Sequence, residues 1–117
     1  MVHLGNHTLI DYFDCDHETV SSSTLVETHL LEAARLIHAT VVQTVVHQFN
    51  PYGISGVIVI AESHLAIHTW PEFKSAAVDI FTCNKQIDVE PAIRYLAQAF
   101  KTPNFQTFRL ERGRFAK

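Results

Sequence analysis

The chain is poor in the residues that mark secreted, nucleic-acid-binding and membrane proteins. It has only two cysteines, Cys15 and Cys83, and its N-terminus lacks a signal-peptide pattern. Such cysteines are more often free thiols than a disulfide, so we expect a reduced Cys83 that is available for chemistry. The net charge is only −3, and like charges form no block. Nothing draws the chain to nucleic acid or to an anionic membrane, so we expect a cytoplasmic protein whose ligand is a small molecule.

Long apolar runs and flexible linkers are also missing. The longest apolar run, Ile54 to Ala61, is interrupted near its start and is far too short to cross a bilayer. A chain of 117 residues forms one domain, which buries roughly two thirds of the surface that its unfolded form exposes. We therefore expect a single domain over residues 1–117, in which a long pocket needs a second subunit.

Segments rich in β-branched and aromatic residues predict five or six strands. The strands are expected over Leu9 to Phe13, Thr40 to Phe49, Ile54 to Ala61, Ala77 to Cys83 and Phe105 to Leu110, and residues 67–70 favour a further strand.

Two segments have apolar residues at helical spacing. The first helix is expected over Leu25 to His38, with a capping box of Thr24 and Glu27. In the second, Asp88 can cap the helix and Pro91 is tolerated in its first turn. Two amphipathic helices and a mostly antiparallel sheet predict an α+β fold, a two-layer sandwich with both helices on one face of the sheet.

The second face of this sheet is also apolar and must be shielded from water by another part of the protein or by a partner. Residues Val57 to Ile60 are all apolar, so both faces of their strand are apolar, although the helices cover only one. Either a long loop covers the other face, or that face packs on a partner's sheet or lines a site.

One segment carries most of the chemical information, residues 62–72, with the sequence ESHLAIHTWPE. It sets Ser63 directly after the carboxylate residue Glu62 and places His68 five residues further on. A hydroxyl in this setting can attack the carbonyl that precedes it, and the serine can then be converted into an electrophilic carbonyl group. The segment is therefore interpreted as a self-processing site.

Together with residues 50–56 (NPYGISG) and 77–83 (AVDIFTC), this segment resembles the prokaryotic S-adenosylmethionine decarboxylase proenzymes of polyamine synthesis. The resemblance runs from LGNH at residues 4–7 through ERG at residues 111–113. Lys74 and Asn84 depart from it, because the family often carries glycine at these positions, which both fall in expected turns. The departures affect the local loop shape and leave the chemistry intact.

The resemblance implies self-cleavage between Glu62 and Ser63, giving a β chain of residues 1–62 and an α chain of residues 63–117. The Ser63 hydroxyl attacks the Glu62 carbonyl, the amide becomes an ester, and elimination followed by hydrolysis leaves a covalent pyruvoyl group at residue 63. Amide-to-ester exchange is uphill, so the fold must help through strain, a stabilised oxyanion and a proton acceptor. The resemblance assigns His68 as the acceptor and Ser55 as the hydrogen-bond donor to the oxyanion.

The implied reaction is a carbon–carbon lyase reaction that needs neither pyridoxal nor a metal. The substrate amine forms a Schiff base with the pyruvoyl ketone, which draws in the electrons released as carbon dioxide leaves. The family pattern assigns Cys83 as the residue that returns a proton to the substrate. Without the flanking motif, Cys83 would be interpreted as a small buried hydrophobe.

S-adenosylmethionine has three groups that a protein can bind, an adenine, a ribose diol and a sulfonium cation. Phe49, Tyr52 and Trp70 can stack on adenine or face the cation, and Glu72 can accept both ribose hydroxyls. The resemblance supports Phe49 and Glu72 more than Tyr52 and Trp70.

Eight histidines raise the alternative of a metal site built from His64, His68 and Cys83. On a strand, however, residues four apart lie about 13 Å from each other and cannot share one ion. His7, His47 and the remaining histidines have no ligand-like spacing, so we interpret them as hydrogen-bonded strand or surface residues.

Five residues of extended chain separate Ser63 from His68, about 16 Å at strand rise. Either a sharp turn lies between them or the histidine comes from a second copy. We expect a homodimer, with two β and two α chains after processing. In it Ser63 and Cys83 of one copy meet Ser55, His68, Phe49 and Glu72 of the other.

Two rival functions remain open. A decarboxylase of the same fold can act on arginine or ornithine, and a non-catalytic subunit can activate a paralogue. The joint presence of Ser63, His68 and Cys83 argues against the second rival.

Overall fold

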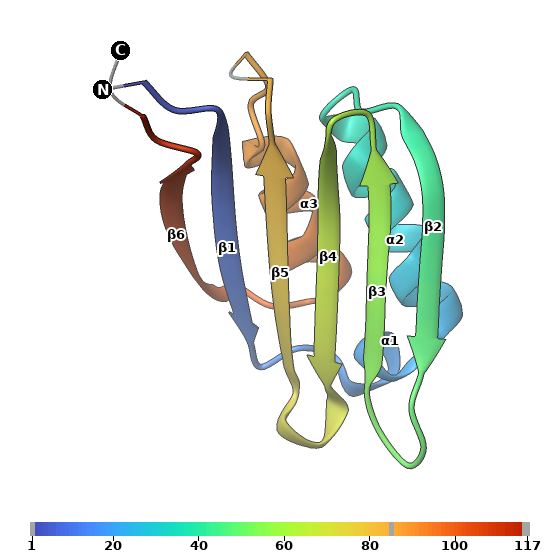
Figure 1. Ribbon diagram of the computed structural model, residues 1–117. Coiled ribbons are helices and arrows are strands. Elements are labelled where there is room, and N and C mark those ends of the chain that lie inside the picture. The colour runs from blue at the N-terminus through green and yellow to red at the C-terminus, as the bar shows by residue number, and fades with distance from the viewer. Residues whose placement is uncertain (1, 85, 116–117) are drawn as a thin grey trace.

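A computed structural model describes residues 2–84 and 86–115 and has the expected two-layer α+β architecture (Figure 1). One six-stranded sheet has the order β2-β3-β4-β5-β1-β6, and all neighbouring strands are antiparallel. The strands are β1 (Gly5–Phe13), β2 (Val41–Gln48), β3 (Ile54–Ile60), β4 (Ser63–Trp70), β5 (Ser75–Thr82) and β6 (Asn104–Arg112). The helices are α1 (His17–Ser21), α2 (Ser23–Leu36), α3 (Glu90–Ala99) and the 3-10 helix η1 (Pro71–Phe73).

The helix ends differ from the sequence prediction in detail. Helix α2 begins earlier than expected, because the extended residue Ser22 is its N-cap and the Ser22 hydroxyl accepts a hydrogen bond from the Leu25 N–H at 3.1 Å. The predicted capping box at Thr24 is therefore wrong. Asp88 accepts from the Glu90 N–H at 3.0 Å, although Val89 is the N-cap of α3, and Pro91 lies in the first turn as expected.

Helix α1 was not expected from the sequence. It has five residues and is capped by Asp16, whose carboxylate accepts a hydrogen bond from the Thr19 N–H at 3.2 Å. A helix of this length is too short to show a helical period, so only its cap marks it in the sequence.

The hydrophobic core lies between the helices and one face of the sheet. Alternate strand residues point into it, including Ile58 of β3 and Leu65 of β4, both with no exposed surface. Tyr12 of β1 is also fully buried, and its hydroxyl donates a hydrogen bond to the Ile93 carbonyl of α3 at 2.8 Å. Burial raises the pKa of this phenol, so it stays a donor that ties α3 to the sheet.

The opposite face of the sheet is open. Its apolar residues are far more exposed than those of the core face, with Val45 52%, Val59 38% and Phe108 51% exposed. All the labelled helices lie behind the sheet on the other side (Figure 1). Among residues 2–84 and 86–115, no long loop covers this outer face, which excludes the first of the two alternatives considered from the sequence, a strand under a long loop. Within the same ranges, no helix is long and apolar enough to cross a membrane.

The turn at Lys74 generates a stability prediction. Lys74 ends η1 with φ 50° and ψ 43°, a left-handed conformation that glycine adopts without steric cost. Lys74→Gly should therefore raise the free energy of unfolding by about 1 kcal/mol, measured by urea denaturation. Arg94→Gly is the control, because glycine inside the exposed side of α3 should lower that free energy by about 1 kcal/mol. A Lys74→Gly variant that is less stable than the unmodified chain would contradict the left-handed conformation of residue 74.

Candidate active site

The scissile junction expected from the sequence lies in the tight turn between β3 and β4. Ile60 pairs with Ser63 across the hairpin, so Ala61 and Glu62 alone form the connection. Glu62 has φ 61°, in the left-handed region. A non-glycine residue held there costs of order 1–3 kcal/mol, which the surrounding hairpin must supply. The residue whose carbonyl precedes Ser63 is thus held in a strained backbone conformation.

Ser63 and Cys83 lie together at this end of the sheet. Ser63 begins β4, and its hydroxyl oxygen accepts a hydrogen bond from the Cys83 N–H at 3.1 Å, just beyond the end of β5. Both cysteines are free, as expected, and Cys83 is exposed while Cys15 is buried. Burial raises the pKa of Cys15 to about 11, so that thiol is inert. The exposure of Cys83 rules out the alternative of a small buried hydrophobe.

The other expected site residues gather at the opposite end of the sheet. Ser55 of β3 faces His68 of β4 across the ladder, and the Ser55 hydroxyl lies 2.9 Å from His68 Nδ1. A cleft of about 160 Å³ opens beside this pair. We call it the aromatic cleft; its lining includes Phe49, Tyr52, Ser55, His68, Trp70 and Glu72.

One chain does not bring the two groups together. Figure 1 shows the β3–β4 turn at one end of the sheet and the β2–β3 loop at the other. Strand β4 runs without interruption from Ser63 to Trp70, which excludes the sharp turn considered from the sequence. Its extended length separates Ser63 from His68 by about 16 Å.

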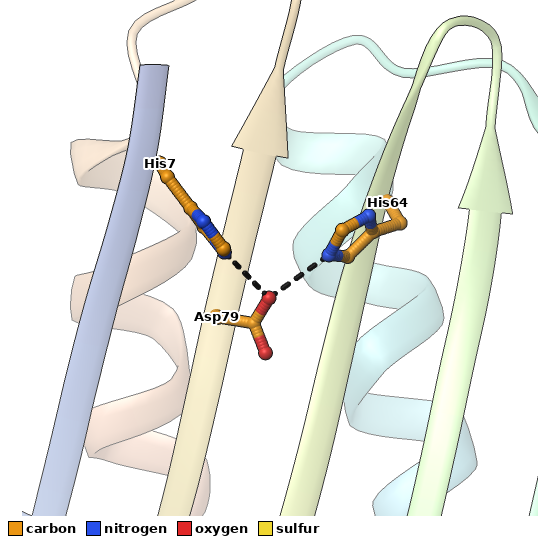
Figure 2. A group of neighbouring side chains, drawn as sticks. All are labelled: His7, His64 and Asp79. Carbon is orange, nitrogen blue, oxygen red and sulfur yellow. Dashed lines mark hydrogen bonds and ion pairs between the residues drawn. The ribbon is translucent and has the colours of Figure 1, made fainter. Parts of the chain in front are cut away.

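A third group of polar residues was missed by the sequence analysis. His7 Nε2 and His64 Nε2 lie 2.8 Å and 2.9 Å from the same Asp79 oxygen, Oδ2, on the outer face (Figure 2). His7 is a hydrogen-bonded strand residue, as expected from the sequence. The convergence was hidden because it depends on the register that sets His7 and His64 on either side of Phe81.

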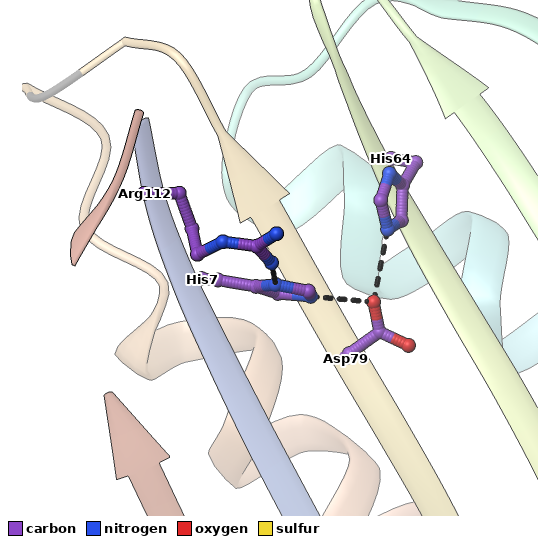
Figure 3. A network of polar contacts seen from close by, with 4 residues as sticks. All are labelled: His7, His64, Asp79 and Arg112. Atoms are coloured by element: carbon purple, nitrogen blue, oxygen red, sulfur yellow. Dashed lines mark hydrogen bonds and ion pairs between the residues drawn. The ribbon is translucent and has the colours of Figure 1, made fainter. Parts of the chain in front are cut away.

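This group has the composition of a metal site, with three ligand atoms within 4.8 Å of one another. Its hydrogen bonds favour a different interpretation. Arg112 NH1 lies 2.9 Å from His7 Nδ1, and a guanidinium can only donate (Figure 3). The His7 proton therefore lies on Nε2, the atom that a metal would need free. The metal trio considered from the sequence does not form either, because His64 contacts Asp79 and His68 contacts Ser55.

Comparisons with known proteins show which family this chain resembles over nearly its whole length. Residues 6–113 match the family model described as S-adenosylmethionine decarboxylase. The S-adenosylmethionine decarboxylase proenzyme of Acidithiobacillus ferrooxidans is 46% identical over 110 residues, covering 94% of this chain and 83% of the relative. That of Thermotoga maritima is 43% identical over 115 residues, covering 98% and 88%. The crystal structure of the Aquifex aeolicus adenosylmethionine decarboxylase superimposes with a TM-score of 0.89 at 28% identity, covering 100% of this chain and 97% of that one.

A match of this length to proenzymes defines the class of the protein as a self-processing carboxy-lyase. The chain belongs to the S-adenosylmethionine decarboxylase family, which uses a pyruvoyl group derived from a serine and supplies polyamine biosynthesis.

The hairpin geometry generates a prediction about processing. Ser63→Ala should fold and assemble but remain one full-length chain without decarboxylase activity, because alanine has no nucleophile for the acyl shift. Intact mass under denaturing conditions measures the outcome. Ser75→Ala is the control, since Ser75 opens β5 as Ser63 opens β4 and its loss should leave cleavage unchanged. Cleavage of Ser63→Ala at this junction would exclude Ser63 as the nucleophile.

Proposed function

We propose that this chain cleaves itself between Glu62 and Ser63 and then decarboxylates S-adenosylmethionine. The products of cleavage are a β chain of residues 1–62 and an α chain of residues 63–117. The product of decarboxylation is the aminopropyl donor for polyamines. The observation that carries the proposal is the strained Glu62, with φ 61°, directly before a serine whose hydroxyl contacts Cys83.

Cleavage begins with attack of the Ser63 hydroxyl on the Glu62 carbonyl. The C–O bond of an ester forms as the peptide C–N bond breaks, and the hydroxyl proton passes through His68 to the amine nitrogen of residue 63 that leaves the carbonyl. Loss of the Ser63 α-proton then expels the Glu62 carboxylate, which takes the former Ser63 hydroxyl oxygen with it and leaves a dehydroalanine. Water hydrolyses this residue to the pyruvoyl group and releases its nitrogen as ammonia. The hairpin supports this step because Glu62 is exposed in the turn that joins the ends of β3 and β4.

The Ser55–His68 pair suits the two remaining tasks. When His68 Nδ1 carries its proton, it donates to the Ser55 hydroxyl oxygen across their 2.9 Å separation. This leaves His68 Nε2 as the basic atom and leaves the Ser55 hydroxyl proton free to donate to the oxyanion. In this tautomer, one hydrogen bond leaves a free basic nitrogen on His68 and aims the oxyanion donor.

The residues fit the pyruvoyl group, because Ser63 lies at a strand end beside an exposed thiol. That group supplies an electron sink for decarboxylation without a metal or pyridoxal. Cys83 holds the proton that returns to the substrate carbon, and the contact of its N–H with the Ser63 hydroxyl places it beside residue 63 before cleavage.

The aromatic cleft suits the nucleoside part of the substrate. Phe49, Tyr52 and Trp70 are 49%, 57% and 44% exposed, so their faces are available for stacking. Glu72 supplies a carboxylate that can accept both ribose hydroxyls. Arginine or ornithine would gain little from an aromatic lining, so the cleft favours S-adenosylmethionine over these alternatives.

A complete site requires two copies of the chain. Ser63 and Cys83 of one copy meet Ser55, His68, Phe49 and Glu72 of the other when two outer faces pack together about a two-fold axis. The continuous strand β4 and the exposed apolar outer face support this arrangement. A cytoplasmic location remains a prediction from the sequence.

The exposed thiol generates a kinetic prediction. Cys83→Ala should lower kcat by about 100-fold, because general acid catalysis contributes at least this much, while self-cleavage is affected less. Substrate turnover and intact mass report the two properties separately. Cys15→Ala is the matched control, since Cys15 is buried and its loss should leave kcat unchanged. Near-normal turnover by a processed Cys83→Ala enzyme would remove Cys83 from the mechanism.

The shared site can be tested by co-expression of two chains that are each blocked alone. In a mixed dimer of Ser63→Ala and His68→Ala, one site regains an intact serine and an intact histidine. We expect cleavage of the His68→Ala chain only when the Ser63→Ala chain is present, measured by mass spectrometry of differently tagged chains. No rescue in proven mixed dimers would exclude a site shared between copies.

A further inference from the structure

The outer face carries a polar network that crosses four adjacent strands. It runs from Arg112 of β6 through His7 of β1 and Asp79 of β5 to His64 of β4 (Figure 3). We call these four residues the outer-face network. None of them takes part in the chemistry derived above, yet His64 is the residue directly after Ser63.

The hydrogen bonds of the network have a fixed direction. Arg112 donates to His7 Nδ1 at 2.9 Å, so His7 donates from Nε2 to Asp79 Oδ2 at 2.8 Å. His64 Nε2 donates to the same oxygen at 2.9 Å. Hydrogen bonds to an ionised acceptor are roughly twice as strong as neutral ones. Asp79 therefore holds the His64 ring of β4 to β5 and, through His7, to β1.

Ring contacts hold His64 from its other sides. Its ring stacks on Phe81 with centroids 5.7 Å apart and an angle of 19°. It also meets the His7 ring edge to face at 5.8 Å and 86°. The side chains of His7, Asp79 and His64 are only 14%, 25% and 37% exposed. His64 thus has one well-defined position.

Cleavage changes what holds this part of β4. In the uncut chain, the turn ties Ser63 to Ile60 covalently. After cleavage between Glu62 and Ser63, β4 begins at a free chain end, and such ends fray unless they are tied down. The first ladder pairs that remain involve His64, opposite Val59 and Phe81.

We propose that the outer-face network makes His64 a positioning residue, which holds the start of the cleaved α chain against fraying. This inference rests on the proposed function, because it requires cleavage at Ser63. A fixed His64 fixes the amide that joins it to residue 63, and hence the orientation of the group formed there relative to Cys83. Reacting groups need such fixed geometry for catalysis.

The test compares Asp79→Ala and Asp79→Asn in cleaved protein and in the uncleaved Ser63→Ala background. Alanine removes the shared acceptor, whereas asparagine keeps an oxygen that both imidazoles can reach. The main measurement is hydrogen–deuterium exchange at residues 64–66. In cleaved protein, Asp79→Ala should speed this exchange roughly tenfold, the effect of losing a charge-assisted hydrogen bond, and in uncleaved protein much less.

The kinetic result should agree with the exchange. In cleaved Asp79→Ala, kcat should fall roughly tenfold with KM little changed, because the aromatic cleft is untouched. Asp79→Asn should restore most of both properties. Asp11→Ala is the matched control, because Asp11 projects from β1 on the same face as His7 and is outside the network.

The outcomes separate the inference from the function on which it rests. Equal acceleration of exchange in cleaved and uncleaved Asp79→Ala, or none in either, would overturn the inference, since a simple sheet clamp does not depend on cleavage. If the unmodified chain is never cleaved at Glu62, the proposed function fails and the inference with it.

His64→Phe is the second variant if Asp79→Ala does not fold. It keeps the stacking on Phe81, loses the donor, and should give the same exchange pattern.

Discussion

Strand β4 lies inside the sheet, and hydrogen bonds to β3 and β5 hold it straight along its length. Its pairs with β3 run from Ser63 to Thr69, and its pairs with β5 run from His64 to Trp70. A strand held on both sides cannot bend to bring its ends together. The serine at one end and the histidine near the other are therefore kept apart by the same bonds that define the fold. This constraint supports the proposed site built from two copies of the chain.

The two faces of the sheet have different physical roles. Helices bury Ile58 and Leu65 on one face, whereas Val59 and His64 lie on the other, which no described helix covers. In the proposed dimer the outer-face network would become buried. A buried carboxylate is costly unless it is paired, and Asp79 already accepts two hydrogen bonds from imidazoles. The network therefore suits a face that a second copy covers.

Local patterns predicted most of this structure, and the failures have a common cause. Strand composition and the helical period depend on neighbours in sequence, and they located five strands and the helices α2 and α3. The processing motif is local too, and the residues that the resemblance assigned to substrate binding line the aromatic cleft. The association of His7 with Asp79 depends on strand register across 72 positions, which no local pattern encodes. The left-handed conformation of Glu62 depends on the length of the turn after β3. Lys74 has a positive φ, which suits the glycine that the resemblance led us to expect at this position.

Two effects can promote cleavage, the backbone strain at Glu62 and the hydrogen bond from Ser55 to the oxyanion, and their sizes differ. The left-handed conformation of Glu62 stores of order 1–3 kcal/mol, and it is present in a single chain. One aimed hydrogen bond to an oxyanion is worth about 3–4 kcal/mol, and its donor, Ser55, lies at the other end of the sheet. Strain alone is thus the smaller contribution and cannot replace the donor and the base. In the proposed dimer the larger contribution arrives only with the second copy, so processing should follow assembly.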